Sequence, residues 1–369
     1  MQKVKMSIVE YQCYLNDITG KGYQSVCSNS IVENSFTLYR CNEHRLLISY
    51  YPSLEIMTEY EKPSDFCLND IEQSHSVICE PKLILLGVEI EKNDNNGMGI
   101  IIRLENGKFI IIDGGYKRNE DACLIYNTLI EQSLDPNTIV ISAWIITHTH
   151  NDHCGAFMCF TEMYRDKITV ERFLFRPSED NYPESQTRYH EILPSLFSLY
   201  DGAEICYVHT GQRFAFGGAE LEFLFTPENL LEIGDYTQPN TNSLVFTIEY
   251  NGQKLLITGD ATDIVMKFLK NSYGEYLKCD LLQAAHHGAA HGDPDPRSPD
   301  LKDIDDFYEL TDPNVVLWPT SQFHYQNWVL NGKRPGFKVL MNGKREHICS
   351  GNTNKIYIFS SYTNGSIKI

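Results

Sequence analysis

The chain contains one local pattern twice: two strand-like runs around an Asn-Gly pair, with an aspartate ending the second run. The first copy is GIIIRLENGKFIIIDGG, Gly99–Gly115, and the second is SLVFTIEYNGQKLLITGD, Ser243–Asp260. Each Asn-Gly pair predicts a β-hairpin, because type I′ turns need positive φ. Helical patterns follow at Asp121–Leu134 and Asp263–Leu269. Two halves that each run hairpin, aspartate and helix predict a pseudo-symmetric sandwich with helices outside, a four-layer α/β fold.

Length and composition allow one large domain with an extension before it. The chain has 369 residues, of which 42% are hydrophobic and 22% charged, which excludes a disordered or fibrous chain. Residues 1–80 carry little chemistry, and we expect a small β-rich extension there, with a hairpin around Cys41–His44. Residues 81–369 form the predicted main domain. We expect the extension to cover one edge or mouth of the sandwich and to shape access to it.

Charge and cysteine content restrict the partners and the compartment. Lys and Arg number 31 against 49 Asp and Glu, a net charge of -18, so extended nucleic acid is disfavoured and a small or locally recognised substrate is expected. The longest apolar runs, Leu83–Val88 and Ile139–Ile146, are far shorter than the ~20 residues of a membrane span. The first residues lack the apolar core of a signal peptide. Eleven cysteines without a CxxC pair favour a reduced, cytoplasmic chain, and the oligomeric state stays open.

A cluster of ligand-type side chains follows directly after an apolar strand. The segment WIITHTHNDHCGAF, Trp144–Phe157, contains His148, His150, Asp152 and His153 within six residues. Positions two apart on an extended chain face the same side, so His148 and His150 can share one metal ion. A turn into a helix would project Asp152 and His153 to a neighbouring point. Imidazole and carboxylate donors suit Zn²⁺, and also Mn²⁺ or Fe²⁺, so we predict one or two such ions here.

This segment resembles the HxHxDH motif of the metallo-β-lactamase superfamily, a group of metal-dependent hydrolases with an αββα sandwich. The resemblance leaves only the first 80 residues outside. It implies that Asp113 in FIIIDGG orients a metal-bound histidine and that Asp260 in LLITGD bridges two metal ions. In motif style the chain is most similar to the hydrolase-like domain of competence-type DNA-uptake proteins and to phosphorylcholine-esterase-type members.

The paired histidines His286 and His287 follow the apolar run Leu281–Ala285. We expect them at the end of a strand, where adjacent residues point to opposite sides and cannot easily bind one metal ion. The resemblance implies that His287 binds the second metal beside Asp260. His286 would then face the substrate and steady negative charge or protonate the leaving group. A tight turn at His286 would allow these roles to be exchanged.

One element departs from the family pattern, which often supplies a further histidine to the first metal before the bridging aspartate. The equivalent stretch reads TQPNTNSLVF, with Asn240 and Asn242 but no histidine. His190 and His209 lie in that interval, but surface exposure or packing explains each of them more readily. We therefore expect a weaker first site, or one completed by water, Asn242 or another residue.

These motifs predict hydrolysis by a metal-activated water, with Asp152 accepting a hydrogen bond from the nucleophile. The resemblance favours phosphodiester or phosphoester substrates. Two alternatives stay open: a carboxylic-type hydrolase acting on a lactone, thioester or amide, and a non-catalytic metal-binding scaffold on the same fold. The retained ligand set argues against the scaffold, because a decayed site would lose ligands at random.

Overall fold

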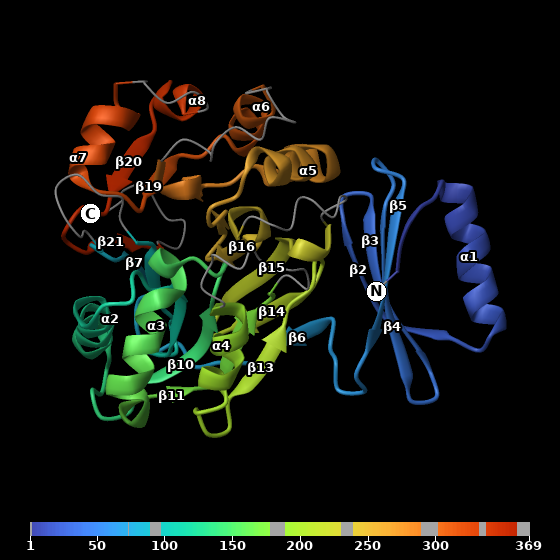
Figure 1. Cartoon of the computed structure of the whole chain (residues 1–369), viewed down its shortest axis with the longest axis horizontal. Coiled ribbons are helices and arrows are strands. Elements are labelled where there is room, and N and C mark those ends of the chain that lie inside the picture. Colours follow the sequence, from blue (N-terminus) through green and yellow to red (C-terminus); the bar gives the residue numbers. More distant parts are fainter. Residues whose placement is uncertain are drawn as a thin grey trace.

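The computed structural model describes residues 2–72, 74–88, 97–177, 189–229, 239–288, 302–331 and 337–359. These residues form two eight-stranded sheets that pack face to face, and a five-stranded sheet beside them (Figure 1). In the described part of the chain, no helix combines the length and apolar character that a membrane span requires. All eleven cysteines lie within the described residues, and none of them forms a disulfide.

The first sandwich sheet has the strand order β13-β12-β10-β9-β8-β7-β21, with β11 beside β10. Its strands are β7 (Lys82–Leu85), β8 (Gly99–Arg103), β9 (Phe109–Asp113), β10 (Val140–Ile145), β11 (Thr169–Val170), β12 (Arg172–Phe175), β13 (Glu204–Tyr207) and β21 (Lys355–Ile358). The helices α2 (Asn119–Gln132), α3 (Asn151–Tyr164) and α4 (Tyr189–Phe197) pack on its outer face. Both faces of this sheet are covered, which explains why its strands are apolar at nearly every position.

The second sandwich sheet has the order β20-β19-β18-β17-β16-β15-β14-β6. Its strands are β6 (Asn69–Ile71), β14 (Arg213–Phe216), β15 (Ala219–Phe225), β16 (Val245–Tyr250), β17 (Gln253–Ile257), β18 (Leu281–Gln283), β19 (Val315–Trp318) and β20 (Glu346–Cys349). The helices α5 (Asp263–Tyr273), α6 (Lys302–Thr311) and α8 (Lys338–Met341) contribute to the core on its outer side. Shorter helical segments are α7 (Gln322–His324), η1 (Arg165–Lys167), η2 (Pro227–Asn229), η4 (Pro239–Asn242), η5 (Gly274–Leu277), η6 (Ala285–Gly288) and η7 (Tyr325–Val329).

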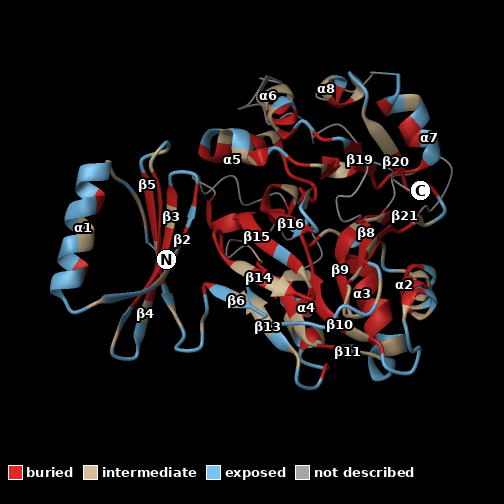
Figure 2. Cartoon of the chain, turned by 180° about the vertical axis from the view of Figure 1, so that it is seen from behind, coloured by how far each residue is buried: buried red, intermediate tan, exposed pale blue. Residues whose placement is uncertain are grey.

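These layers confirm the predicted αββα sandwich. A buried cluster fills the space between the two sheets, with Ile110 and Ile112 of β9 on one side and Phe246 and Ile248 of β16 on the other. Figure 2 shows this burial along the facing strands. Because the side chains of a strand alternate, Ile111 between them packs instead against the outer helices.

Both predicted hairpins are present. The second, β16–β17, closes on Tyr250 and Gln253 through Asn251 and Gly252, which both have positive φ as a type I′ turn requires. The first, β8–β9, has a longer connection, and of its Asn-Gly pair only Gly107 has positive φ. The strand pairing was therefore predictable at both places, but the turn geometry only at the second.

The N-terminal region forms the sheet β1-β5-β4-β3-β2, made of β1 (Gln2–Lys5), β2 (Gln24–Ile31), β3 (Asn34–Cys41), β4 (His44–Tyr51) and β5 (Ile56–Lys62). Helix α1 (Ile8–Gly20) covers its far face (Figure 2). Its near face packs on the sandwich, where the ring of Tyr51 in β4 lies 5.5 Å from that of Phe268 in α5. The predicted Cys41–His44 hairpin is the β3–β4 turn.

Candidate metal centre

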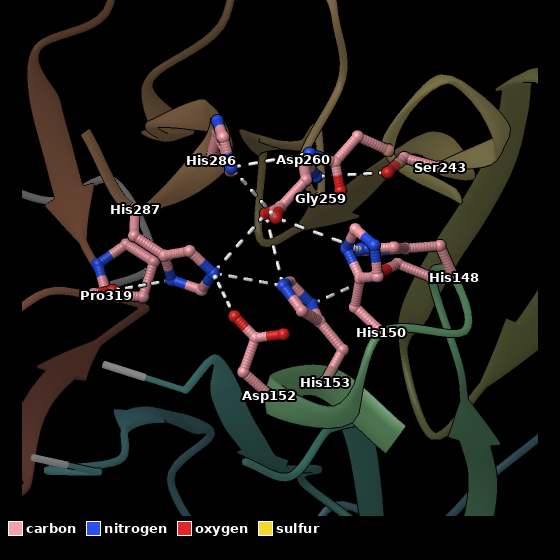
Figure 3. A network of polar contacts seen from close by, with 12 residues as sticks. His148, His150, Asp152, His153, Ser243, Gly259, Asp260, His286, His287 and Pro319 are labelled. Atoms are coloured by element: carbon pink, nitrogen blue, oxygen red, sulfur yellow. Dashed lines mark hydrogen bonds and ion pairs between the residues drawn. The ribbon is translucent and has the colours of Figure 1, made fainter. Parts of the chain in front are cut away.

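The strands of both sheets deliver polar side chains to one edge of the sandwich. Strand β9 ends at Asp113, and β10 is followed by His148 and His150. In the second sheet, Asp260 follows β17 and the pair His286–His287 follows β18. Figure 3 shows the side chains from the two sheets converging. The carboxyl ends of parallel strands are where α/β folds bind ligands, so this edge is the candidate site.

The start of α3 separates the clustered residues into two directions, as the sequence predicted. His150 has an extended backbone and precedes the helix, and its carbonyl accepts hydrogen bonds from the backbone N–H groups of His153 and Cys154 at 3.1 and 3.0 Å. Asp152 and His153 therefore project from the first helical turn, whereas His148 and His150 project from the chain before it. A carboxylate in the first turn is also favoured by the helix dipole.

The ligand-type atoms form two groups, within each of which they lie within 4.8 Å of one another. One group is His148, His150 and Asp260, and the other is Asp152, His153, Asp260 and His287. Asp260 belongs to both, because its Oδ2 lies 3.7 Å from Nε2 of His148 and its Oδ1 lies 3.1 Å from Nε2 of His153. The structure thus brings together the four residues predicted from spacing and the two, Asp260 and His287, that the family resemblance implied.

Two buried hydrogen bonds orient the imidazoles of the second group. Nδ1 of His153 donates to Oδ2 of Asp113 at 2.7 Å, and Nδ1 of His287 donates to the carbonyl of Pro319 at 2.9 Å. Asp113 is itself held by the backbone N–H and the hydroxyl of Thr147, at 2.8 and 2.7 Å. With both Nδ1 protons engaged, Nε2 is the nitrogen of each ring that is left to bind a metal ion, and the two Nε2 atoms are 3.0 Å apart.

Burial and neighbouring charges act in opposite directions on this group. Burial lowers the pKa of His287, but Asp260 and Asp152 outweigh it and raise that pKa to about 9. Burial also lowers the pKa of His153, which Asp260 and Asp113 nevertheless raise well above its usual range. The carboxylate of Asp152 keeps a pKa below its usual range because the two imidazoles outweigh its own burial. The negative charge of the carboxylates therefore favours a positive charge at the point where the two Nε2 atoms approach each other.

The predicted strand at His286 and His287 is wrong. Strand β18 ends at Gln283, and both histidines lie in the turn η6 with φ values of 51° and 56°. The side chain of Gln283 donates to the backbone carbonyls of Gly259 and Ala284, which anchors the strand end just before this turn. Opposite faces of a strand therefore do not separate the two histidines.

The two side chains differ in position all the same. His287 is buried, with its Nε2 3.2 Å from Oδ2 of Asp152, whereas the side chain of His286 is 21% exposed. The Nε2 of His286 lies 3.9 Å from Oδ2 of Asp260 and 3.3 Å from Nδ2 of Asn240. His287 is thus part of the second group, and His286 lies at its margin.

The first group has three ligand-type residues among those the structure describes. Burial lowers the pKa of both His148 and His150, which leaves their imidazoles neutral and able to bind metal. His190 lies in α4, 3.8 Å from Glu191, and His209 is buried against Glu228, so neither belongs to this group.

Sequence reasoning missed three groups that support the site. The carbonyl of Pro319 fixes the ring of His287, the hydroxyl of Thr147 lies 3.1 Å from Nδ1 of His148, and the hydroxyl of Ser243 accepts from the backbone N–H of Asp260 at 3.1 Å. Thr147 and Ser243 stand beside the recognised motifs and could have been suspected. A backbone carbonyl carries no side-chain signal, so Pro319 could not.

The donors fit a divalent metal ion. Oδ1 of Asp260 is buried and accepts no hydrogen bond within the described residues, although it lies 3.1 and 3.5 Å from Nε2 of His153 and His287. A buried carboxylate oxygen without a hydrogen-bond donor is costly unless a cation lies against it, and the two imidazole nitrogens beside it can bind the same cation. Histidine and carboxylate donors suit zinc, manganese and iron alike, so the donor set leaves the identity of the metal open.

The fold and this edge define an αββα sandwich with a two-part His/Asp centre. Residues 95–291 match the family model of the metallo-β-lactamase superfamily. The match spans more than half of the chain, and the chain belongs to this superfamily. No curated protein matches the sequence.

Several solved structures resemble the chain at low identity. The metallo-β-lactamase fold protein YhfI from Bacillus subtilis is 12% identical, with 76% of this chain and 100% of that chain covered and a TM-score of 0.48. Igni18, a metallo hydrolase from Ignicoccus hospitalis, is 14% identical, with 76% and 100% covered and a TM-score of 0.42. CmlA, a diiron β-hydroxylase from Streptomyces venezuelae, is 15% identical, with 76% and 54% covered and a TM-score of 0.47. Likenesses of this size carry no conclusion about the reaction.

Proposed function

We propose that the protein is a metal-dependent hydrolase that uses an activated water, with phosphodiesters or phosphoesters as its substrates. The observation that carries this proposal is the approach of His153 and His287, whose Nε2 atoms lie 3.0 Å apart while each Nδ1 is engaged elsewhere. Two ring nitrogens so close, beside two carboxylates, require a positive charge between them, and a metal ion can supply it in place of protons. The carboxylates of Asp152 and Asp260 supply the negative charge that holds such a cation.

Asp152 and His286 have different proposed roles beside the metal ion. A divalent ion held by the two ligand groups would lower the pKa of a bound water toward about 7 and would polarise the substrate oxygen. The Asp152 side chain is 21% exposed against 1% for Asp260, so it is the carboxylate that accepts a hydrogen bond from the attacking water and aims it. His286, at the margin of the group and equally exposed, protonates the leaving group or steadies its charge.

The shared position of Asp260 supports a phosphorus centre as the point of attack. Its two oxygens face different groups, so an ion held in each group would suit the in-line displacement of a phosphoester. The three-ligand first group favours a second candidate, carboxylic-type hydrolysis of a lactone, thioester or amide. A single ion suffices there, because only one carbonyl must be polarised.

A substrate panel tests the proposal. The protein is loaded with zinc, manganese or iron and assayed with a chromogenic phosphodiester, phosphomonoester, lactone and β-lactam, before and after chelation. We expect the phosphodiester or phosphomonoester to be turned over, with activity lost on chelation. Turnover of the lactone or β-lactam alone would transfer the function to the carboxylic class. A fully metal-loaded protein without any turnover would instead be the non-catalytic scaffold.

We also propose that the protein depends on zinc, works in the cytoplasm and acts on a small or locally recognised substrate. The eleven free cysteines support a reducing compartment, and the net charge of -18 disfavours extended nucleic acid. We propose zinc because it suits imidazole and carboxylate donors, and manganese or iron are the alternatives that the same donors accept.

A further inference from the structure

The turn η6, which carries His286 and His287, has a backbone conformation that histidine rarely adopts. Both histidines have positive φ, 51° and 56°, and Gly288 after them has a φ of 70°. Left-handed backbone is strained for any residue with a side chain, and it persists only where surrounding contacts hold it. The positions of both histidines therefore depend on what the turn packs against.

One segment, residues 318–329, packs against this turn. It runs from the end of β19 through α7 and η7. A Cβ added at Gly288 would lie 3.0 Å from the ring of Trp318 and 3.0 Å from Cγ2 of Val329. The segment is fixed to the end of β20, because the carbonyl of Trp318 accepts from the backbone N–H of Ser350 at 3.0 Å. Both ends of an anchored segment thus contact the same glycine of the turn.

His324 lies in the middle of this segment and forms a hydrogen bond to the turn. Its imidazole is buried, and its Nε2 lies 3.1 Å from the carbonyl oxygen of Gly288. Because a carbonyl oxygen only accepts, Nε2 carries the proton and donates it. The backbone N–H of His324 donates to Oγ of Ser321 at 3.0 Å, which caps the start of α7. The backbone from which the ring projects is therefore held as well.

The same segment also fixes the ring of His287. The carbonyl of Pro319 accepts from Nδ1 of His287 at 2.9 Å (Figure 3). The His287 ring and the backbone just after it are thus bound by one segment. This arrangement keeps Nε2 of His287 3.2 Å from Oδ2 of Asp152 and 3.5 Å from Oδ1 of Asp260. A turn that relaxed to common backbone angles would move this nitrogen away from both carboxylates.

His324 acts on the metal centre through the backbone. Neither ligand group in the described part of the chain includes it, and the Nε2 that donates to Gly288 has no lone pair left for a metal ion. We propose that His324 is a positioning residue, whose hydrogen bond to Gly288 keeps η6 in the left-handed form that aims His287 at the metal ion. This inference rests on the metal centre of the proposed function and is independent of the substrate class.

Zinc affinity tests this role without an assay of turnover. His324→Phe keeps a ring of similar size but has no N–H to donate to Gly288. Competition with a chelating dye should show that its zinc affinity is about tenfold or more below that of the wild type, the usual effect of removing a group that orients a metal ligand. His324→Gln provides an amide N–H at about the place of Nε2, so it should recover most of the affinity.

Cobalt absorption reports the geometry of the ligands. The visible bands of bound Co²⁺ depend on the arrangement of the ligands around the ion. Cobalt-loaded His324→Phe should therefore have a spectrum that differs from that of the wild type, whereas His324→Gln should have the wild-type spectrum. A loss of stability that left the ligands in place would not change these bands.

A pair of glycine variants tests the turn without changing His324. Gly288→Ala places a Cβ against Trp318 and Val329, whereas Gly252→Ala, at a φ of 75°, has nothing within 4 Å of the added Cβ. Both substitutions strain a left-handed position, but only Gly288→Ala should lower zinc affinity, by about tenfold or more. Circular dichroism verifies that each variant is folded, and the glycine pair decides the question if His324→Phe does not fold.

The outcomes separate the positioning role from the proposed function. Reduced zinc affinity in His324→Phe and Gly288→Ala, but not in His324→Gln and Gly252→Ala, supports the role even where no ester is hydrolysed, and then the proposed function alone fails. Wild-type zinc affinity in folded His324→Phe or Gly288→Ala overturns the role, whether or not the phosphodiester is hydrolysed. Losses as large in His324→Gln or Gly252→Ala also overturn it, because the hydrogen bond to Gly288 would then not be their cause.

Discussion

The direction of each ring nitrogen determines whether the histidines of this centre can bind a metal ion. The sequence identified His148, His150 and His153 from spacing, and the resemblance added His287, but neither specified which nitrogen is free. That information comes from Asp113, which the motif suggested, and from the carbonyl of Pro319, which no motif marks. Residue identity was therefore predictable, and the hydrogen bonds that prepare each ring were predictable only in part.

The substitution Asp113→Asn tests whether the hydrogen bond to Asp113 prepares the His153 ring for metal binding. The amide fits the same space but no longer provides the charged acceptor for Nδ1 of His153, so we expect zinc affinity to fall about 10–100-fold. Competition with a chelating dye measures it. Asp17→Asn, at an exposed aspartate paired with Lys21, serves as the control. Equal zinc affinities of the two variants would show that the contact to Asp113 does not prepare the ring.

The paired histidines make a second test at this scale. His286→Ala should keep its metal and lose about 10²–10⁴ in turnover, the worth of one proton or charge donor. His287→Ala should lose both metal and turnover, because its buried ring belongs to the second group. Elemental analysis beside the assay separates the two effects. Metal lost from His286→Ala and kept in His287→Ala would reverse the assignment.

Among the elements, long strands and hairpins followed from the sequence, and short turns did not. Hydrophobic runs and Asn-Gly pairs indicated β8–β9 and β16–β17 because their pattern is local. The turn η6 has left-handed conformations at two histidines, which the sequence does not favour and tertiary contacts must hold. For that reason the prediction of a strand at His286 and His287 was wrong.

Helix α3 carries Asp152 and His153, and it packs closely against a neighbouring segment of backbone at a glycine. A Cβ added at Gly155 would lie 2.3 Å from the backbone nitrogen of Lys117. Gly155→Ala should therefore destabilise the protein by about 1–3 kcal/mol through overpacking, although alanine is the better helix former.

Urea unfolding followed by circular dichroism measures that loss, with Gly20→Ala as the matched control. Gly20 ends α1 with nothing within 4 Å of an added Cβ, so its substitution should change the free energy of unfolding by less than about 1 kcal/mol. A similar stability for both variants would mean that α3 adjusts without cost.

At the scale of the whole molecule, the sandwich was predictable and the attachment of the N-terminal sheet was not. The sequence indicated one hairpin in the first 80 residues, whereas the structure has five strands there and a sixth, β6, that pairs with β14 of the sandwich. Contacts between Lys62 and His209, or Tyr51 and Phe268, join residues far apart in the chain, and no local pattern reports them. The expectation that the extension shapes access to the site stays a prediction.

His209, which lies where the N-terminal sheet meets the sandwich, should make the stability of the protein depend on pH. The pKa of His209 is about 4 in the folded chain, below its ordinary 6.5, so its contribution is present above 6.5 and is lost as pH falls toward 4. The free energy of unfolding of the wild type minus that of His209→Gln should decrease between these values, by up to about 1.4 kcal/mol per pH unit. Urea unfolding with metal removed from both proteins measures this difference. A difference that stays constant or grows as pH falls would contradict the buried, neutral imidazole.

The metal content of the wild type and of Asp260→Ala tests the account most directly, because Asp260 belongs to both ligand groups. Both proteins are loaded with zinc, dialysed and analysed for metal, with circular dichroism to verify that each is folded. We predict one to two equivalents of zinc in the wild type and almost none in folded Asp260→Ala. Equal zinc in the two proteins, or none in the wild type, would contradict a metal centre at this edge of the sandwich.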